Sequence, residues 1–368
     1  MDNKILFEIL VSECIKNNYS DLHLNTLHKP FIRNHYGEME NINQVTVDGF
    51  LNDTPVLTKD NIIEIIKLIA GDMGYLKFQD NFELDISYKY RDSDRFRVNC
   101  YADTSGYNIA MRKIPIEIPS MDDLGLGDTV KQMCQKAKGL ILVTGPTGCG
   151  KSTNLAAMID YINTNFKKHI LTIEDPVEFG FISKMSLVNQ RELGNSTHSF
   201  SNAIRAALRE DPNVIMVGEM RDAETIKAAI TLAETGHLVM STLHTNDTVQ
   251  TIDRIIDVFP VGQQEQIRMQ LAMSLLGVVS QRLLPRIDKE GRIAAREIMI
   301  ANDAIRNLII TGKTHQLYSV IEIGQSEGMI LMDKYLMVLY NKGIIDKDTL
   351  RSFARDKDQM EGIINNQQ

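Results

Sequence analysis

The chain has 368 residues, which is long enough for two domains that each bury a core of their own. Its hydrophobic content of 43% and charged content of 24% are typical of a globular protein. A net charge of −8 argues against a general nucleic-acid binder, because such a protein carries an excess of basic residues.

The sequence lacks the marks of a secreted, membrane-spanning or zinc-binding protein. Its four cysteines are scattered without a Cys-x-x-Cys pair, which excludes a zinc ribbon and a disulfide framework. No apolar run approaches the roughly 18 residues of a transmembrane helix. Asp2 and Glu8 interrupt the apolar pattern at the N-terminus, unlike in a signal peptide. We therefore expect a cytoplasmic chain with no transmembrane segment of its own.

Residues 1–115 are predicted to form an α+β domain. Apolar residues at helical spacing over 4–16 indicate an opening helix, and a second helix begins after Thr58 or Asp60. Strict alternation of apolar and polar residues over 82–90, 96–102 and 107–111 then predicts an antiparallel meander with one apolar face.

The polar face of this meander carries two arginines. If the loop at residues 103–106 closes symmetrically, Arg97 and Arg112 stand directly opposite each other, an arrangement that is destabilising for like charges. An anion contacted by both would explain the pair. Two solvated side chains that splay apart would explain it equally well.

Pro115, Pro119 and the Gly125-Leu126-Gly127 turn mark a linker over residues 116–127. Beyond it, residues 128–368 alternate between strands and helices, which predicts an α/β domain with a mostly parallel sheet. The predicted strands are 140–143, 169–173, 214–217 and 238–241. From about residue 285 onward the pattern is read as helical.

A phosphate-binding loop follows the first of these strands. Residues 145–152 match G-x-x-x-x-G-K-[ST], and a helical pattern starts at Ser152. Glycines let backbone N–H groups turn toward phosphate oxygens, Lys151 is expected to reach the β- and γ-phosphates, and Ser152 to ligate Mg²⁺. The predicted nucleotide-binding residues are Gly145, Pro146, Thr147, Gly148, Cys149, Gly150, Lys151, Ser152 and Thr153.

Cys149 lies inside this loop, near the N-terminus of the predicted helix. Such a position lowers the pKa of a thiol, so we expect oxidation of Cys149 to inactivate the protein.

Two other strand ends carry carboxylates that suit nucleotide chemistry. Glu174 follows one strand, in a segment whose acidic groups either hold the waters of a Mg²⁺ ion or form a solvated acidic loop. Glu219 follows another and is the candidate to orient or deprotonate the attacking water, with a surface glutamate as the alternative. Gly218 stands where the Walker B pattern places a metal-binding Asp.

His237 and His244 flank the strand over 238–241. Their spacing does not suit a His-x-His metal site. Sensing the γ-phosphate is the better functional reading for this pair, and for either histidine alone a structural role is equally well supported.

Four segments together resemble a known set of motifs. GPTGCGKST, TIEDPVE, NVIMVGEMRD and GHLVMSTLHT look like the Walker A, Asp-box, Walker B and His-box motifs of the type II/IV secretion ATPase superfamily. LVNQRE, AIRAALREDP, TIDRIIDVFP and AIRNLI are similar to its PilT-like type IV pilus retraction ATPases, as are FRVN and AMRKIP in the meander. The resemblance covers essentially the whole chain.

The resemblance implies a PAS-like N-terminal domain, a RecA-like P-loop ATPase domain with a helical C-terminal portion, and a homohexamer that retracts pili with ATP and Mg²⁺. It implies a platform protein of the inner membrane as partner and peripheral association with that membrane. The acidic charge balance, in turn, predicts no nucleic acid as a partner. Family roles carry over to Glu174 (Mg²⁺ assistance), Glu219 (catalytic carboxylate), Arg97 and Arg112 (a neighbour's nucleotide), and the His-box positions His237 and His244.

Three features depart from the family pattern. Cys149 replaces a serine, Ile310 replaces the last arginine of an AIRNLIR segment, and the N-terminal domain is longer between Asn43 and Thr58. Such divergence would suit a specialised system such as a bundle-forming pilus. The alternatives are a pilus assembly or secretion ATPase, a weakly catalytic ring-shaped scaffold, and a nucleic-acid motor, which the acidic balance disfavours. Assembly and secretion relatives generally carry a longer N-terminal region and a four-cysteine zinc module.

Overall fold

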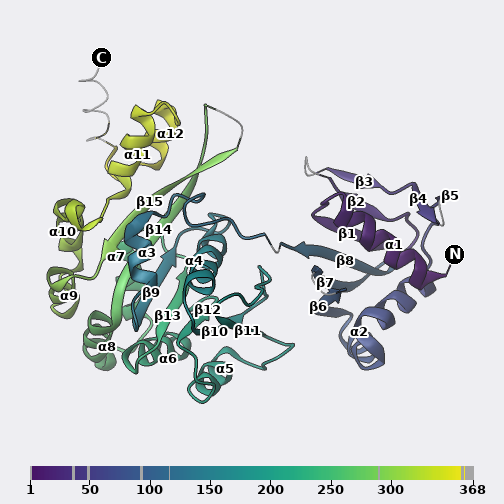
Figure 1. The fold of residues 1–368 in the computed structure, drawn as a ribbon, viewed down its shortest axis with the longest axis horizontal. Coiled ribbons are helices and arrows are strands. Elements are labelled where there is room, and N and C mark those ends of the chain that lie inside the picture. Colours follow the sequence, from purple (N-terminus) through teal and green to yellow (C-terminus); the bar gives the residue numbers. More distant parts are fainter. Residues whose placement is uncertain are drawn as a thin grey trace. The chain divides into compact units, whose positions relative to one another are not determined.

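The computed structural model separates the chain into two compact units (Figure 1). The first comprises Met1–Glu117 with Pro176–Gly180, and the second Ile118–Asp175 with Phe181–Gln368. The residues that the structure describes are 2–34, 38–47, 50–91, 94–115, 117–288, 291–357 and 360.

The first unit is built on an antiparallel sheet of six strands. Its spatial order is β3 (Met39–Asn41), β2 (Phe31–Arg33), β1 (Asp21–Asn25), β8 (Gly106–Ile114), β7 (Asp94–Asp103) and β6 (Glu83–Tyr90). The predicted meander is confirmed as β6–β8, and Arg97 pairs with Arg112 in the register of β7 and β8.

Two helices cover the apolar face of this sheet. They are α1 (Asn3–Lys16) and α2 (Lys59–Asn81), and Phe7, Ile66 and Phe78 from them join Val98 and Met111 of the strands in one core. Thr58 caps α2 as predicted, because its hydroxyl accepts from the Asn61 N–H while the Asn61 side chain accepts from the Thr58 N–H.

The longer stretch between Asn43 and Thr58 forms a separate two-stranded ribbon of β4 (Gln44–Val47) and β5 (Phe50–Asp53). Val45 anchors it in the core, whereas Phe50 and Leu51 are 75% and 72% exposed. The ribbon therefore adds an apolar surface at one edge of the unit.

The second unit is built on a seven-stranded sheet, parallel except for its last strand. The sheet order is β11 (Leu187–Glu192), β10 (His169–Glu174), β12 (Val214–Val217), β13 (Leu238–Leu243), β9 (Gly139–Thr144), β14 (Leu275–Pro285) and β15 (Arg292–Ile300). All four predicted strands are present, and β11, β14 and β15 are additional.

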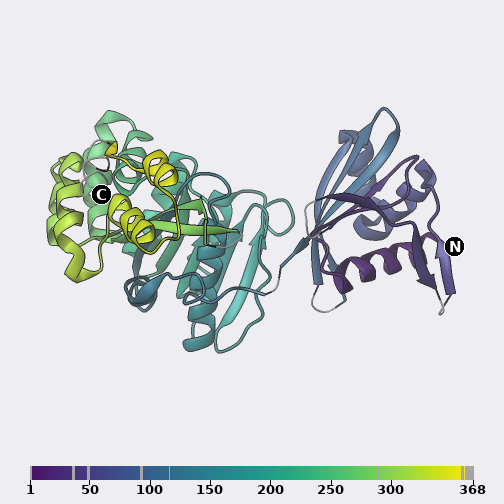
Figure 2. The same ribbon diagram turned by 90° about the horizontal axis from the view of Figure 1, so that it is seen from above.

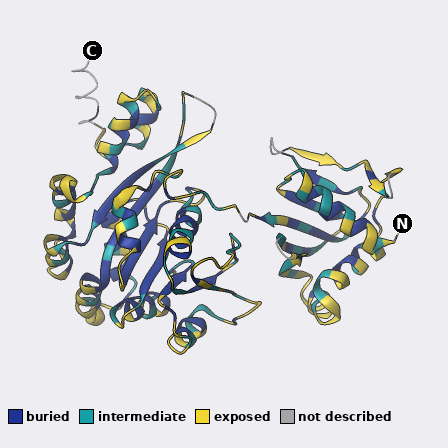
Figure 3. Cartoon of the chain, viewed as in Figure 1, coloured by how far each residue is buried: buried dark blue, intermediate teal, exposed yellow. Residues whose placement is uncertain are grey.

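Helices lie on both faces of this sheet (Figures 1 and 2). Alternate residues of β9 divide between two cores, with Leu140 and Leu142 in one and Ile141 and Val143 in the other. Burial on both faces explains the unbroken apolar runs of the strands, which are dark blue in Figure 3. The flanking helices are α3 (Gly127–Cys134) and α4 (Lys151–Asn165) on one face, and α5 (Phe200–Ala207), α6 (Ala223–Glu234), α7 (Thr248–Asp257) and α8 (Val261–Ser274) on the other.

The expectation that helices begin near residue 285 is wrong. β14 runs to Pro285 and pairs with β9, and the antiparallel β15 returns along it. The helical C-terminal portion starts only at Asp303. It consists of α9 (Asp303–Ile310), η1 (Thr314–Gln316), α10 (Leu317–Ile323), η2 (Gly324–Glu327), α11 (Met332–Asn341) and α12 (Lys347–Phe353).

The helical reading failed because Arg292–Ile300 alternates poorly, with Ala294, Ala295 and Glu297 in a strand that is largely buried on both faces. Ile310, the departure from the family pattern, is the last residue of α9 and is 39% exposed. In the described part of the chain, no helix combines the length and the apolar character that a membrane span requires.

Candidate nucleotide-binding site

The predicted phosphate loop connects β9 to α4 at the carboxyl edge of the parallel sheet. Gly145, Gly148 and Gly150 have φ angles of 145°, 75° and 87°, a region that residues with a side chain rarely adopt. Gly145 also packs against the Gln281 backbone, where a Cβ atom would collide. The glycines are therefore required by the path of the chain as well as by any bound phosphate.

The N-terminus of α4 points out of this loop. Its N-cap, Gly150, offers no side chain to the N–H groups of the first turn. Such a helix start is a site for anions, because N–H groups and the helix dipole converge there. Ser152 and Thr153 are half-buried in the first turn, and Pro146, Thr147 and Gly148 form the exposed tip of the loop.

Lys151 lies within the loop and is 8% exposed. Its Nζ donates to the carbonyl oxygens of Gly145 at 2.9 Å and Pro146 at 3.0 Å. The Nδ1 atom of His244 lies 3.5 Å from the same Nζ atom. The loop thus holds its cation at the position where phosphate charge would need it.

Glu219 and His244 meet beside the lysine. The Nε2 atom of His244 lies 3.6 Å from Oε2 of Glu219, so the imidazole spans the space between Lys151 and the carboxylate. Arg221 binds the other oxygen of Glu219 at 2.5 Å. These residues come from the phosphate loop and from the ends of β13 and β12. No pattern in the sequence singles out Arg221, although it stands only two residues after Glu219.

Glu174 ends β10, the strand beside β12. It is 6% exposed, and its Oε1 accepts from Thr172 Oγ1 at 2.6 Å and from Gln190 Nε2 at 3.1 Å. Between the two strand ends, Gly218 donates its N–H to the Ile173 carbonyl at 2.8 Å. A Cβ atom at Gly218 would make only ordinary van der Waals contacts with the β10 backbone, so strand packing does not by itself require glycine there.

His237 is separated from this cluster by the length of β13. Its Nδ1 lies 3.0 Å from the Leu232 carbonyl oxygen, at the end of the strand opposite to His244. The structure therefore gives His237 a local role at the end of α6 and brings only His244 to the phosphate loop.

The expectation of a reactive Cys149 is wrong. The residue is 3% exposed, and burial raises the pKa of its thiol, an effect that outweighs the lowering by Lys151. A helix N-terminus activates a thiol only when the thiol is accessible and faces the positive field. Here the side chain packs against Gly145 instead.

Arg97 and Arg112 belong to the first unit and lie in a row of charges across its sheet. Arg112 donates to Asp21 at 2.8 Å, and Arg33 lies 3.6 Å from the same carboxylate. Burial raises the pKa of Asp21, but hydrogen bonds from Ser20 and Arg112 lower it by more. The pKa of Asp21 is therefore below its ordinary value. Asp21 thus offsets the repulsion between the two opposed arginines, both of which are exposed.

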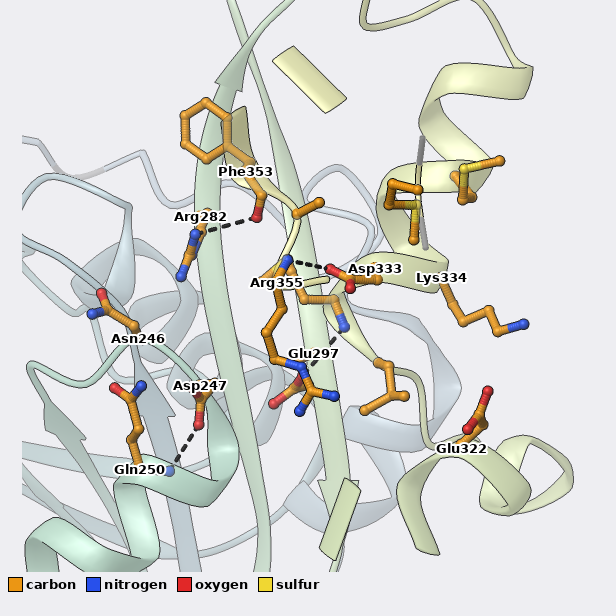
Figure 4. A pocket seen from close by; sticks show the side chains of 15 residues that line it. Asn246, Asp247, Gln250, Arg282, Glu297, Glu322, Asp333, Lys334, Phe353 and Arg355 are labelled. Carbon is orange, nitrogen blue, oxygen red and sulfur yellow. Dashed lines mark hydrogen bonds between the residues drawn. The ribbon is translucent and has the colours of Figure 1, made fainter. Parts of the chain in front are cut away.

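Two cavities of the second unit share Asn246, Arg282 and Phe353 as walls. One, of about 360 Å³, runs along the loop from Pro146 to Cys149. The other, of about 400 Å³, lies between the β14–β15 pair and the C-terminal helices, and in Figure 4 Arg282 reaches the Phe353 carbonyl oxygen at its edge. Neither Arg282 nor Phe353 carries a sequence signal of its own.

The residues present fit a magnesium–nucleotide complex and not a metal held by protein alone. Among the described residues, no group of three His, Cys, Asp or Glu side chains could hold a metal ion. The Ser152 hydroxyl and the nearby carboxylates instead suit an ion that keeps several waters and is held mainly by phosphates.

Comparisons with known proteins agree with this geometry. Residues 3–320 match the family model described as type II/IV secretion system protein. The chain is 45% identical over 348 residues to the type IV pilus retraction ATPase PilT of Pseudomonas aeruginosa, covering 94% of this chain and 97% of that one. It is also 45% identical to a twitching motility protein of Neisseria gonorrhoeae, covering 90% and 86%.

A solved structure is similar to this fold over nearly its full length. The crystal structure of the pilus retraction motor PilT with bound ADP superposes with a TM-score of 0.84 at 42% identity, and the match covers 96% of this chain and 98% of that one.

Proposed function

This chain belongs to the type II/IV secretion system protein family, and we propose that it is a motor ATPase that uses ATP hydrolysis to retract a type IV pilus. The observation that carries the proposal is the meeting of Lys151, His244 and Glu219 beside a phosphate loop. The names of the relatives that match nearly the whole chain support the same function.

In this proposal the loop binds the phosphates of ATP through its backbone N–H groups and Lys151. Ser152 would hold Mg²⁺, with Glu174 and Glu219 near its waters, and the ion would neutralise charge on the phosphates. Glu219 orients the attacking water and accepts its proton. His244 contacts both the lysine and this carboxylate, so it is placed to report loss of the γ-phosphate.

We further propose the domain division 1–115, linker 116–127 and ATPase domain 128–368, and a homohexameric ring. In the ring, Arg97 and Arg112 of one subunit reach the nucleotide of the next. Their exposure on a polar sheet face supports this role. The ring would act from the cytoplasmic face on a platform protein of the inner membrane, because retraction must draw pilin subunits back into that membrane.

The direction of the motor is tested in cells that lack this protein. Retraction predicts excess static pili and loss of twitching, whereas an assembly or secretion ATPase predicts bald cells or a secretion defect. Expression of the Glu219→Gln variant in these cells separates a motor from a scaffold. If the protein is a motor, this variant should leave the cells with static pili. If it is a scaffold, the same variant should restore the wild-type pili.

A further inference from the structure

The side chain of Gln281 is buried behind the phosphate loop and bonds to three elements at once. Its Nε2 donates to the Cys149 carbonyl oxygen at 2.6 Å. Its Oε1 accepts from Asn154 Nδ2 of α4 at 2.9 Å and from Arg296 Nε of β15 at 2.7 Å. With 3% exposure, it exchanges none of these bonds easily for water.

Arg296 continues this network away from the loop. Its two Nη atoms donate to the carbonyl oxygens of Leu124 at 2.6 Å and Gly125 at 3.0 Å, in the turn that precedes α3. The residue is 2% exposed, and burial lowers the pKa of its guanidinium, with Tyr335 acting in the opposite direction. A buried cation is costly unless its donors are satisfied, and the rigid guanidinium fork suits these three acceptors in a way that an ammonium group does not.

The bond to Cys149 fixes more than one atom. In a planar trans peptide the carbonyl and the following N–H point in opposite directions. Holding the Cys149 carbonyl toward Gln281 therefore points the N–H of Gly150, the N-cap of α4, away from Gln281. That N–H belongs to the group that a phosphate would use, and Gly150, at a φ of 87°, has no side chain to restrict its rotation.

We infer that Gln281 is a positioning residue that holds the phosphate loop in its binding form, and that Arg296 couples this hold to the turn at Leu124–Gly125. This inference rests on the proposed nucleotide site. Movement of the turn would draw Arg296 from Gln281, release the Cys149 carbonyl and loosen the loop. Hydrogen bonds form a continuous path from the turn to the loop.

The Gln281→Glu variant separates positioning from stability. A glutamate keeps the oxygen that Asn154 and Arg296 bind, and it adds an ion pair with Arg296, but it has no N–H for the Cys149 carbonyl. Gln264→Glu is the matched control, because Gln264 lies in α8, outside the phosphate loop, and the change removes its Nε2 bond to the Phe259 carbonyl just before that helix.

Three measurements test the first half of the inference: the thermal unfolding midpoint, the affinity for a fluorescent ADP analogue, and amide hydrogen exchange in peptides that cover residues 145–152. We expect Gln281→Glu to unfold within a few degrees of wild type, to bind the analogue at least ~10-fold more weakly, and to exchange faster in the loop without nucleotide. Wild-type loop exchange and affinity in a folded variant would overturn the role of Gln281.

The second half is tested with Arg296→Lys, whose ammonium can reach Gln281 but cannot reproduce the fork to Leu124 and Gly125. We expect faster exchange both in the turn, residues 120–126, and in the loop. Faster exchange in the turn alone would overturn the coupling. Because exchange is measured without nucleotide, these outcomes stay informative even if wild type binds no ADP analogue, a result that would instead refute the proposed function.

Discussion

Lys151 is the side chain on which phosphate binding is expected to depend most. It is held inside the loop by two carbonyls, so its charge is already in place before a phosphate arrives. We predict that Lys151→Ala abolishes binding of a fluorescent ATP analogue while Lys167→Ala, an exposed lysine of the same unit, leaves it intact. Equal affinity of both variants would refute the assignment of the phosphate loop.

Glu219 is 15% exposed and is held from two sides by Arg221 and His244. We predict that Glu219→Gln binds ATP normally and hydrolyses it at least ~10²-fold more slowly, the usual effect of losing a general base. Glu265→Gln, an exposed position on α8, serves as the control in a phosphate-release assay. Wild-type turnover by Glu219→Gln would transfer the role to another carboxylate, with Glu174 as the first candidate.

Cys149 is expected to behave as a small buried side chain. Because the reactive thiolate is disfavoured by the raised pKa, native protein should label at Cys149 as slowly as at Cys134, which is also buried in the second unit. Cys149→Ser should retain nucleotide affinity. The measurement is the rate of maleimide labelling at each site by peptide mass spectrometry, and rapid labelling of Cys149 alone would restore the redox hypothesis.

At the scale of elements, Asp21 of β1 joins β2 and β8 by ion pairs with Arg33 and Arg112, and Arg97 of β7 stands opposite Arg112. Folding lowers the pKa of the Asp21 carboxyl. The carboxylate therefore stabilises the unit fully above its pKa in the unfolded chain, about 3.9, and this stabilisation is lost as the pH falls through its pKa in the folded protein. We predict that Asp21→Asn destabilises the unit by about 1–2 kcal/mol near pH 7 and by less below pH ~4.

The buried thiols of Cys14 and Cys100 report unfolding of the first unit, because both lie in its core. A pyridyl disulfide reagent reacts at acid pH as well as at neutral pH. The stability lost in Asp21→Asn should raise the labelling rate of these thiols about 5- to 30-fold at pH 7. Asp80→Asn, exposed on α2, is the control. A difference between Asp21→Asn and wild type that stays constant from pH 7 to pH 3 would contradict the role of this carboxylate.

The elements that the sequence predicted well have a strict period or a clear boundary. The meander alternates over three strands, and Thr58 lies as the N-cap in front of α2. β15 was missed because a strand buried on both faces has no period, and Ala294, Ala295 and Glu297 suit a helix equally well. Glu297 is buried there because it caps the start of α7 at Thr248 and binds the Met332 N–H, contacts that no local pattern encodes.

The same distinction applies to the site. The loop residues Gly145–Thr153 are contiguous and were predicted together, and Glu219 and His244 follow apolar strands. Gln281 and Arg296 were missed because Gln281 contacts the loop and Arg296 contacts the turn at Leu124–Gly125, each across more than a hundred residues of sequence. The error at Cys149 arose because position in a sequence does not tell which way a side chain packs.

At the scale of the whole molecule, the proposed ring makes a prediction that neither unit makes alone. If an arginine of one subunit completes the active site of the next, Arg112→Ala and Glu219→Gln are each inactive as pure rings. Mixed in one ring, some interfaces combine an intact Glu219 with an intact Arg112, and partial ATPase activity should return. The stabilisation of transition-state charge by a neighbour's arginine is the physical reason.

This complementation requires that subunits exchange and that an interface works beside an inactive one. A double variant, Arg112→Ala with Glu219→Gln, mixed with wild type measures how far inactive neighbours suppress turnover. Because Arg112 also binds Asp21, Arg33→Ala is needed as a second control, since it removes the other arginine at that carboxylate while leaving Arg112 in place. If wild type tolerates the double variant but the two single variants never complement, Arg112 acts within its own subunit or only balances the charge of Asp21.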